Sequence, residues 1–173
     1  MEMEILVFSD SHGRAGRIRE AIDRQIKKPD AIIFLGDGLR DIASIDTDGI
    51  PIISVAGNCD LGSMFSLDAP EERCVFLGDK KIFFTHGHRY GVKSTLMPLI
   101  NEAVEREADI LLYGHTHEGY ERELMPDNEY GIRLEKPLYI MNPGSIGSYP
   151  YIFGAITVDK AGRVLLSHGT LEK

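Results

Sequence analysis

The stretch EILVFSDSHG (residues 4–13) sets the direction of the fold, because an apolar run changes abruptly into polar residues and glycine. Its apolar part, residues 4–9, predicts a buried β-strand, and its polar part predicts the loop that ends the strand. Asp10 and His12 therefore follow the carboxyl end of a strand. Residues two apart in an extended segment point the same way, so these two side chains can reach one common site.

The segments that follow predict a helix and two more strands of the same kind. In residues 14–28, apolar side chains recur at helical spacing among charged ones, and a proline closes the segment. Ile18, Ile22 and Ile26 of this segment are expected in the core. The apolar runs 31–35 and 50–56 have the length of buried strands. They stop at Gly36-Asp37-Gly38 and at Gly57-Asn58-Cys59-Asp60. Polar side chains thus follow each of these expected strands.

The second half of the chain repeats this pattern and then changes character. Residues 74–77 and 81–85 predict a hairpin that ends at His86-Gly87-His88. Further expected elements are a helix over 93–107 with Pro98 able to kink its first turn and a strand over 110–113 that ends at Gly114-His115-Thr116-His117. Residues 120–124, 131–134 and 138–142 predict antiparallel hairpins, and residues 153–158 and 163–168 predict another. A strand-helix-strand opening followed by hairpins predicts an α/β sandwich with mixed sheets, and function is expected where the strands end.

Length, composition and charge limit the class of protein. A chain of 173 residues with 43% apolar residues fits one domain, residues 1–173, with a substantial core. No apolar run reaches membrane-spanning length and the N-terminus lacks a signal-peptide pattern, so we expect a cytoplasmic protein that spans no membrane. The net charge of −8 disfavours general nucleic-acid binding but leaves a small phosphate ester open as substrate. Oligomeric state stays open, with a homo-oligomer as one option.

The two cysteines, Cys59 and Cys74, provide no disulfide framework and suit a reducing compartment, although a single bridge stays open. Cys74 lies within an expected strand and fits the role of a small buried hydrophobic residue. Cys59 follows a strand end, between Asn58 and Asp60.

Histidine is concentrated in the loops that follow the expected strands. Five of the six histidines lie in the motifs Asp10-Ser11-His12, His86-Gly87-His88 and His115-Thr116-His117. Asp37 and Asn58 add oxygen donors at two further strand ends. Carboxylate, amide and imidazole donors together suit Mn²⁺, Fe²⁺, Zn²⁺ or Ni²⁺ better than a structural zinc cage, which favours cysteine. Such a donor set is too large for one tetrahedral ion and about right for two ions that share a carboxylate, roughly 3.5–4 Å apart.

In their order along the chain, these motifs resemble the signature of the calcineurin-like metallophosphoesterases: DxH, GD, GN(H/C/N)(D/E), GH and GHxH. They are Asp10-Ser11-His12, Gly36-Asp37, Gly57-Asn58-Cys59-Asp60, His86-Gly87 and Gly114-His115-Thr116-His117. Asn142-Pro143-Gly144-Ser145 extends the resemblance to nearly the whole chain, and the most similar subgroup is the small phosphodiesterases of the YfcE type. A single block is a weak signal, but the ordered set is a strong one.

The resemblance implies both a fold and a ligand assignment. The fold is an α/β four-layer sandwich of two mixed β-sheets flanked by helices, with metals at a loop-lined edge. Matched position by position, Asp10, His12 and His117 hold one metal, Asn58, His86 and His115 hold the other, and Asp37 bridges them. The implied cofactors are two divalent metal ions, with Mn²⁺ preferred and Ni²⁺, Fe²⁺ or Zn²⁺ as alternatives.

The expected activity is that of a metal-dependent phosphodiesterase acting on small phosphoesters. Two cations lower the pKa of the solvent molecule that bridges them, and the resulting hydroxide attacks phosphorus in line while the charges stabilise the phosphoryl oxygens. No nucleophilic side chain is required. We therefore expect direct transfer to water without a phosphoenzyme.

The candidate catalytic residues are Asp37, Asn58, Cys59, Asp60 and His88. In many relatives a histidine at the position of Cys59 contacts the phosphate or assists the leaving group. A thiol is a weak donor and transfers a proton poorly to an alkoxide, which favours diesters over monoesters, and a passive packing role for Cys59 stays open. Asp60 is expected to orient its neighbours. His88 lines the pocket, orients its neighbour or lies on the surface.

Several plainer interpretations stay open. Asp, Asn and Gly populate strand-ending loops in any case, and Asn142 to Ser145 is strong turn chemistry, although the resemblance places it beside the metals. A non-catalytic Vps29-like protein-binding scaffold shares the implied fold but lacks part of the ligand set. A phosphomonoesterase or nucleotide hydrolase with the same metal centre is the other alternative. Such relatives usually carry extra substrate-binding loops, whereas this chain has only short insertions such as residues 61–73.

Overall fold

The protein, described by a computed structural model over residues 2–66 and 68–173, is built on two five-stranded sheets. In sheet A the strands lie in the order β10 (Val164–Thr170), β9 (Ile152–Val158), β1 (Met3–Phe8), β2 (Ala31–Phe34) and β3 (Ile52–Ser54). In sheet B the order is β4 (Glu72–Leu77), β5 (Lys80–Thr85), β6 (Ile110–Leu112), β8 (Leu138–Pro143) and β7 (Gly119–Leu124). Strands β1, β2 and β3 are parallel, as are β5, β6 and β8, and the other pairs are antiparallel. Both sheets are therefore mixed.

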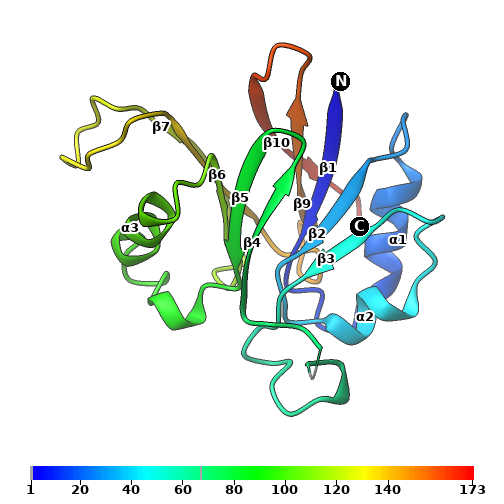
Figure 1. Ribbon diagram of the computed structural model, residues 1–173. Coiled ribbons are helices and arrows are strands. Elements are labelled where there is room, and N and C mark those ends of the chain that lie inside the picture. Colours follow the sequence, from blue (N-terminus) through cyan, green and yellow to red (C-terminus); the bar gives the residue numbers. More distant parts are fainter. Residues whose placement is uncertain (1, 67) are drawn as a thin grey trace.

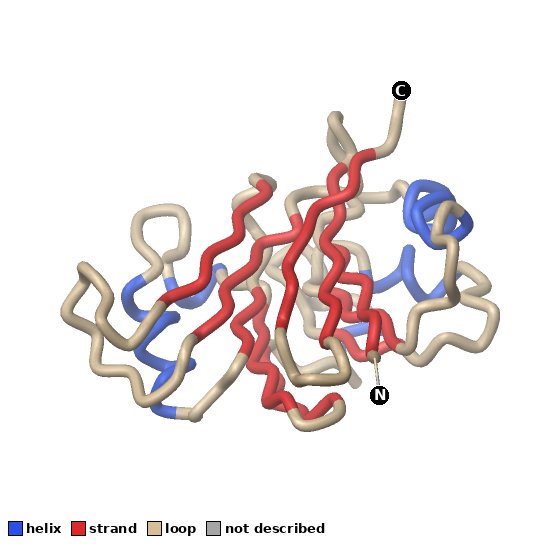
Figure 2. Tube along the Cα trace, turned by 90° about the horizontal axis from the view of Figure 1, so that it is seen from above, coloured by secondary structure: helices blue, strands red, loops and turns tan. Residues whose placement is uncertain are grey.

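Helices cover the outer face of each sheet (Figure 1). α1 (Ala15–Asp23) and α2 (Leu39–Ser44) lie beside sheet A, and α3 (Met97–Glu105) lies beside sheet B, while η1 (Met64–Ser66) and η2 (His88–Tyr90) are short 3₁₀ helices. Seen from above, the strands occupy the middle of the molecule and helices lie on either side (Figure 2). The predicted four-layer α/β sandwich is thus confirmed. Within the described part of the chain, no helix is long and apolar enough to cross a membrane.

The central strands are buried on both faces, which explains why their sequences are continuous apolar runs. In β1, Ile5 and Val7 face sheet B, whereas Leu6 and Phe8 face the helices on the other side. The layer between the sheets also contains Ile33, Ile82, Phe84, Ile110, Leu112 and Met141. Each large apolar side chain that is fully buried contributes roughly 1.5–3 kcal/mol. This packing holds the two sheets against each other and so fixes where their strand ends lie.

The strand ends that carry the polar loops meet at one edge of the sandwich, at the bottom of Figure 1. Within sheet A, the loops after β1 and β2 are joined by a hydrogen bond from the N–H of Asp10 to the carbonyl of Gly36 (3.0 Å). Within sheet B, the N–H of Gly114 donates to the carbonyl of His86 (3.0 Å). The loops that carry the candidate site residues therefore lie together at this edge.

The predicted strand over residues 131–134 is wrong, whereas the expected strands over 120–124 and 138–142 are present as β7 and β8. β7 pairs with β8 instead, with Tyr120 opposite Asn142 and Leu124 opposite Leu138. The side chain of Asn128 explains the difference, because its Oδ1 accepts hydrogen bonds from the backbone N–H groups of residues 130 and 132. These bonds close a local turn that competes with a strand ladder.

The first helix is shorter than predicted. α1 ends at Asp23 rather than continuing through residue 28, and Ile26, which we expected in the core, is fully exposed. The N–H of Gln25 donates to the carbonyl of Ile22 (3.1 Å), so the last turn tightens to a 3₁₀ pattern before the chain enters β2.

Other local expectations are also corrected. Pro98 lies in the first turn of α3, a position where proline is tolerated, and it begins the helix rather than kinking it. Cys74 is exposed rather than buried because β4 is an edge strand, and both cysteines are free. The short helix α2 was not predicted at all.

The two isoleucines of the first helical segment provide a test of its core face. Ile22 is 6% exposed and Ile26 is 102% exposed. We expect Ile22→Ala to lower the free energy of unfolding by about 2–5 kcal/mol, because it leaves a cavity. Ile26→Ala should change it by no more than about 0.5 kcal/mol. Urea unfolding followed by circular dichroism measures both, and equal losses would contradict this assignment.

Candidate metal centre

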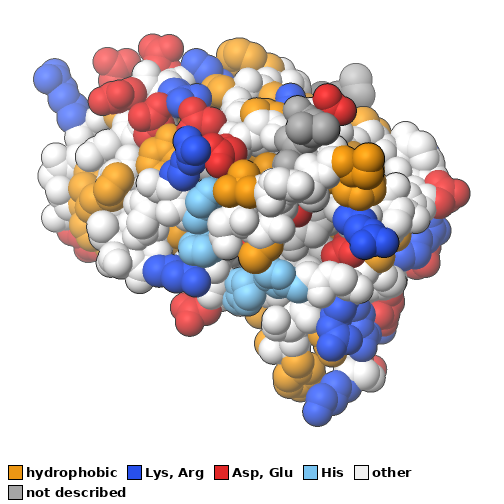
Figure 3. All heavy atoms as spheres, turned by 90° about the horizontal axis from the view of Figure 1, so that it is seen from below, with side chains coloured by type: hydrophobic (Ala, Val, Ile, Leu, Met, Phe, Trp, Pro, Cys, Tyr) orange, Lys and Arg blue, Asp and Glu red, His pale blue; other side chains and the backbone are white. Residues whose placement is uncertain are grey.

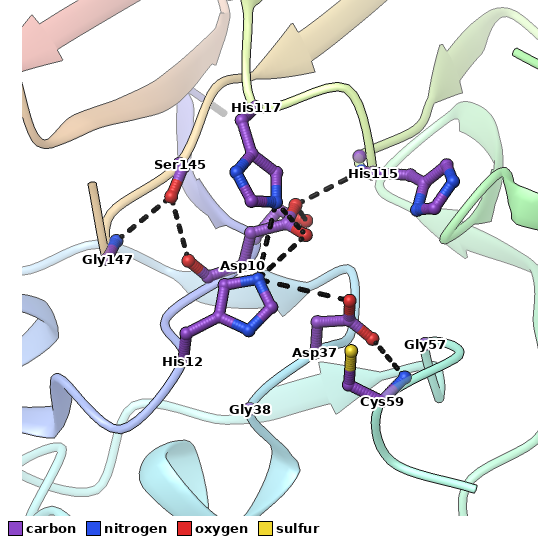
Figure 4. Close-up of polar contacts among 12 residues, drawn as sticks. Asp10, His12, Asp37, Gly38, Gly57, Cys59, His115, His117, Ser145 and Gly147 are labelled. Carbon is purple, nitrogen blue, oxygen red and sulfur yellow. Dashed lines mark hydrogen bonds and ion pairs between the residues drawn. The ribbon is translucent and has the colours of Figure 1, made fainter. Parts of the chain in front are cut away.

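The loops after β1, β2, β5 and β6 bring carboxylates and imidazoles together at the lower edge of the sandwich. On the face seen from below, histidine side chains gather near the middle (Figure 3). In the close-up, His12 and His117 point toward the carboxylate of Asp10, and Asp37 lies between His12 and Cys59 (Figure 4). The donors come from both sheets, because the loops of sheet A carry the aspartates and the loops of sheet B carry His117.

Asp10, His12 and His117 form a first group of donors. The Nε2 atoms of His117 and His12 lie 3.1 and 3.6 Å from Oδ1 of Asp10, and 3.3 Å from each other. Asp10 is completely buried, and its Oδ1 accepts no hydrogen bond from any described residue. A buried charge without a hydrogen-bond partner is costly. An oxygen in this state, faced by imidazole nitrogens, has the surroundings of a metal ligand.

Asp37, His86 and His115 form a second group. Nε2 of His86 lies 3.3 Å from Oδ2 of Asp37 and 3.2 Å from Nδ1 of His115. Nδ1 of His86 donates to the carbonyl of Leu35 (2.8 Å), since a carbonyl can only accept. A backbone carbonyl that fixes one ring nitrogen and aims the other at the site is typical of metal-binding histidines. Oδ2 of Asp37 is also 4.0 Å from Nε2 of His12, so Asp37 lies between the two groups.

The charges of Asp37 and His86 depend on each other. Burial favours a higher pKa for Asp37, but its hydrogen bond with His86, the charge of that ring and the N–H of Cys59 together lower the pKa well below its usual value. Burial favours a lower pKa for His86, yet the carboxylates of Asp37 and Asp10 raise it. Without metal, a proton on His86 therefore compensates the buried carboxylates, and a cation that binds there displaces it. Burial and the neighbouring charge of His86 lower the pKa of His115.

Backbone strain is concentrated in the same loops. Left-handed φ angles are found at Asp10 (55°), His12 (42°), Asp37 (57°), His115 (69°) and His117 (63°). Residues other than glycine rarely adopt this conformation, and each instance costs of order 1–3 kcal/mol. Such outliers persist where the surrounding structure enforces them and often mark functional sites. Here they coincide with five of the residues predicted as metal ligands.

Asn58 and Cys59 lie at the exposed rim of this centre. The N–H of Cys59 donates to Oδ1 of Asp37 (2.8 Å), and its Sγ lies within reach of His12 and Asp37 as a third possible group of donors. The amide of Asn58 contacts the sulfur at 3.5 Å. The predicted role of Asn58 as a metal ligand stays a prediction. Burial and the charges of Asp37 and Asp60 raise the pKa of the Cys59 thiol to about 11.

Asp60 bonds to the backbone of the surrounding loops and is not one of the grouped donors. Its carboxylate is 6% exposed and accepts hydrogen bonds from four backbone N–H groups, those of Asp37 (2.6 Å), Gly57 (2.9 Å), Gly38 (3.0 Å) and Leu39 (3.0 Å). It therefore joins the loop after β2 to the loop after β3. The expectation that Asp60 orients its neighbours agrees with this geometry.

His88 lies beside the second group without joining it. Its ring centroid is 5.5 Å from that of His86 and 6.2 Å from that of His115, and its Nε2 is 3.7 Å from Oε1 of Glu71. Burial and the charge of His86 lower the pKa of His88. Its predicted catalytic role stays a prediction.

Several supporting residues hold Asp10 in place. Its Oδ2 accepts hydrogen bonds from the hydroxyl of Ser9 (2.5 Å) and the N–H of His115 (3.1 Å). Its carbonyl accepts from the hydroxyl of Ser145 (2.9 Å) and the N–H of Gly147 (3.1 Å). Ser145 belongs to the segment that the resemblance placed beside the metals, whereas no sequence signal pointed to Ser9 or Gly147.

The remaining part of that segment braces the loop of His115 and His117. The side-chain amide of Asn142 donates to the carbonyl of Gly114 (3.1 Å) and the hydroxyl of Thr116 (2.9 Å). His168, the one histidine outside the three motifs, contacts the carbonyl of Asn142 through Nε2 (2.7 Å). These contacts hold the backbone of the loop that carries His115 and His117.

The donor set fits divalent cations. Carboxylate and imidazole groups suit borderline metal ions, and the orphaned Oδ1 of Asp10 needs positive charge beside it. Imidazole nitrogens only 3.2–3.3 Å apart, as in the pairs His12–His117 and His86–His115, leave room for at most one proton between them. A metal ion accepts lone pairs from both nitrogens of such a pair.

Comparison with known proteins gives consistent matches. A family model described as the calcineurin-like phosphoesterase superfamily domain matches residues 3–161. The chain is 31% identical over 144 residues to the probable metallophosphoesterase YsnB of Bacillus subtilis, which covers 83% of this chain and 75% of YsnB. It is 30% identical over 125 residues to phosphodiesterase YfcE of Escherichia coli, which covers 67% of this chain and 58% of YfcE. Vacuolar Protein Sorting 29 from Cryptosporidium parvum shares the fold at 17% identity, with a TM-score of 0.70 and 99% of each chain covered.

Replacing Asp60 tests whether its hydrogen bonds hold the loop after β2 against the loop after β3. In Asp60→Asn, one carboxylate oxygen becomes an amide donor that faces two backbone N–H groups. Because each buried N–H left unpaired costs about 1–3 kcal/mol, we expect a loss of about 2–6 kcal/mol in unfolding free energy. Asp159→Asn is a matched control, since Asp159 accepts from the N–H groups of residues 161 and 163 in an exposed turn. Chemical denaturation compares the free energies of unfolding of the two variants. A similarly small loss for both would show that Asp60 does not hold the two loops together.

Proposed function

The chain belongs to the calcineurin-like phosphoesterase superfamily, and from this premise we propose that it is a phosphodiesterase that uses two divalent metal ions. The coarser activity, that of a metal-dependent phosphoester hydrolase, follows from its relatives, and the predicted likeness to the YfcE-type subgroup is confirmed. The observation that carries the finer proposal is the pair of donor groups on either side of Asp37.

In this proposal, Asp37 is shared by the two ions. Asp10, His12 and His117 hold one ion, and Asn58, His86 and His115 hold the other. The distances from Asp37 to His12 (4.0 Å) and His86 (3.3 Å) support the bridging role, while Asn58 is assigned from its position in the family motif. Mn²⁺ is the proposed metal because oxygen and imidazole donors suit it, and Ni²⁺, Fe²⁺ and Zn²⁺ are the alternatives.

The residues of the chain prepare this centre for phosphoryl transfer to water. Bound cations would supply the charge that activates water and stabilises the phosphoryl oxygens. Asp60 fixes the backbone of Asp37, and the carbonyl of Leu35 orients His86. Because no side chain needs to attack phosphorus, we propose that no phosphoenzyme forms.

Cys59 is the feature that favours diesters over monoesters. Hydrolysis of a monoester with a poor leaving group benefits from a proton donor with a pKa near neutrality. A thiol is a weak hydrogen-bond donor and transfers a proton poorly to an alkoxide leaving group. We therefore propose small phosphodiesters as substrates, while monoesters and nucleotides remain the alternative. The likeness to Vacuolar Protein Sorting 29 concerns the fold alone and does not favour a scaffold.

Metal restoration with a panel of esters tests the proposed activity. The purified protein is stripped with chelator, and each of Mn²⁺, Ni²⁺, Fe²⁺ and Zn²⁺ is restored before assays with bis(p-nitrophenyl) phosphate and p-nitrophenyl phosphate. We expect diester hydrolysis with Mn²⁺ and none after chelation.

Asp37→Asn should remain folded by circular dichroism and lose nearly all turnover, because the bridging charge is gone. Metal binding without hydrolysis of either ester would favour the scaffold, and full activity of folded Asp37→Asn would refute the bridge.

Replacing each of the two cysteines by histidine, one at a time, tests the preference for diesters. We expect Cys59→His to raise monoester hydrolysis relative to diester hydrolysis, because an imidazole protonates a leaving group near neutral pH. Cys74→His is the matched control, since Cys74 is exposed on the edge strand β4. The ratio of kcat/KM values for the two esters is the readout. An unchanged ratio in Cys59→His would remove Cys59 from the determinants of specificity.

A further inference from the structure

His12 differs from the other proposed ligands in how its ring is held. His86 is completely buried and its Nδ1 is bonded to the carbonyl of Leu35. The side chain of His12 is 35% exposed, and none of the described residues bonds to its Nδ1. Since no bond at Nδ1 fixes this ring, its place beside Asp10 and His117 depends on the position of its backbone, which has the left-handed φ of 42°. A residue that fixes this backbone therefore helps to keep the ring at the site.

Asp41, in the short helix α2 (Leu39–Ser44), bonds to the residues on both sides of His12. Its Oδ2 accepts a hydrogen bond from the hydroxyl of Ser11 (2.5 Å) and another from the N–H of Gly13 (2.8 Å). Ser11 is completely buried, and Asp41 is 8% exposed. One carboxylate oxygen thus fastens the residue before His12 and the residue after it. Bonds to a charged acceptor in a buried place are stronger than neutral ones.

The neighbouring backbone is adapted to this contact. The N–H of His12 donates to the carbonyl of Asp37 (3.2 Å), so the segment is fastened in its middle as well. Gly38, labelled in Figure 4, has a φ of 151°, and a Cβ at this position would lie 1.8 Å from Oγ of Ser11. Only glycine leaves the space in which Ser11 and Asp41 meet.

We propose that Asp41 is a positioning residue that keeps His12 directed at the metal centre and thereby sets the affinity for one of the two ions. This inference rests on the ligand assignment proposed above. Partners that orient metal ligands typically change metal affinity by 10–100-fold when they are removed. The effect is expected at the ion held by Asp10, His12 and His117, because the second group is oriented by other contacts.

Titration calorimetry of the metal-free protein with Mn²⁺ tests this proposal without relying on turnover. The wild-type chain should bind two ions, and His12→Ala identifies the site to which His12 contributes. We expect Asp41→Ala to weaken that same site by 10–100-fold and to leave the other unchanged. Asp41→Asn should recover most of the affinity, because an amide oxygen can accept both hydrogen bonds.

Controls separate positioning from general loss of stability. Asp109→Ala is the matched control, since Asp109 accepts from the N–H of Lys81 (2.8 Å) and from Nζ of Lys136 (2.7 Å) at the opposite end of β6. It should leave both Mn²⁺ sites unchanged. If Asp41→Ala does not fold, Ser11→Ala removes one of the two bonds and should weaken the same site to a smaller extent.

Each outcome of the titration has a defined meaning. Wild-type affinity at both sites in folded Asp41→Ala, or in Ser11→Ala where that variant takes its place, would overturn the role of Asp41 while leaving the proposed function intact. Equal weakening of both sites would also overturn it. A wild-type chain that binds no Mn²⁺, or an unchanged isotherm in His12→Ala, would overturn the ligand assignment and this inference together.

Discussion

The carboxylate of Asp10 is the point on which the arrangement of the lower edge depends. It is completely buried, and its Oδ2 accepts hydrogen bonds from Ser9 and from the loop after β6. The backbone N–H and carbonyl of Asp10 bond to the loops after β2 and β8. All these partners leave Oδ1 without a hydrogen bond. A buried carboxylate oxygen that accepts no hydrogen bond is costly unless positive charge is close to it. Oδ1 of Asp10 is therefore stabilised by positive charge beside it, and imidazoles from the loops of both sheets surround this atom.

Most of this arrangement could be predicted from sequence because two simple rules agree. Strands buried on both faces have continuous apolar sequences, and parallel strands end at the same edge of a sheet. The runs before Asp10, Asp37 and His86 followed the first rule, and the position of their loops followed from the second. The order of the motifs along the chain then identified the family. The ligand assignment, the role of Asn58 and the single-domain organisation stay predictions, because nearness of donor atoms is not coordination.

What could not be predicted depends on contacts between segments that are distant in sequence. Helix α2 has only six residues and no side-chain cap, so its sequence carried little helical signal. Asp41 gained its importance from Ser11 and Gly13, to which no local pattern linked it. Residues 131–134 alternated like a strand, but β8 was the better partner for β7 and Asn128 captured the local backbone groups. Local sequence sets what a segment can do, and the tertiary contacts decide which option it takes.

The division of donors between the sheets has a consequence for how the two halves of the molecule come together. Asp10 and His12 belong to sheet A, whereas His117 belongs to sheet B and is separated from His12 by 105 residues of chain. A cation held by all three would act as a clasp across the interface between the sheets. Its binding energy is gained only after the sheets have docked, so metal uptake and closure of the sandwich are thermodynamically linked. Metal binding would therefore stabilise the docked arrangement of the two sheets.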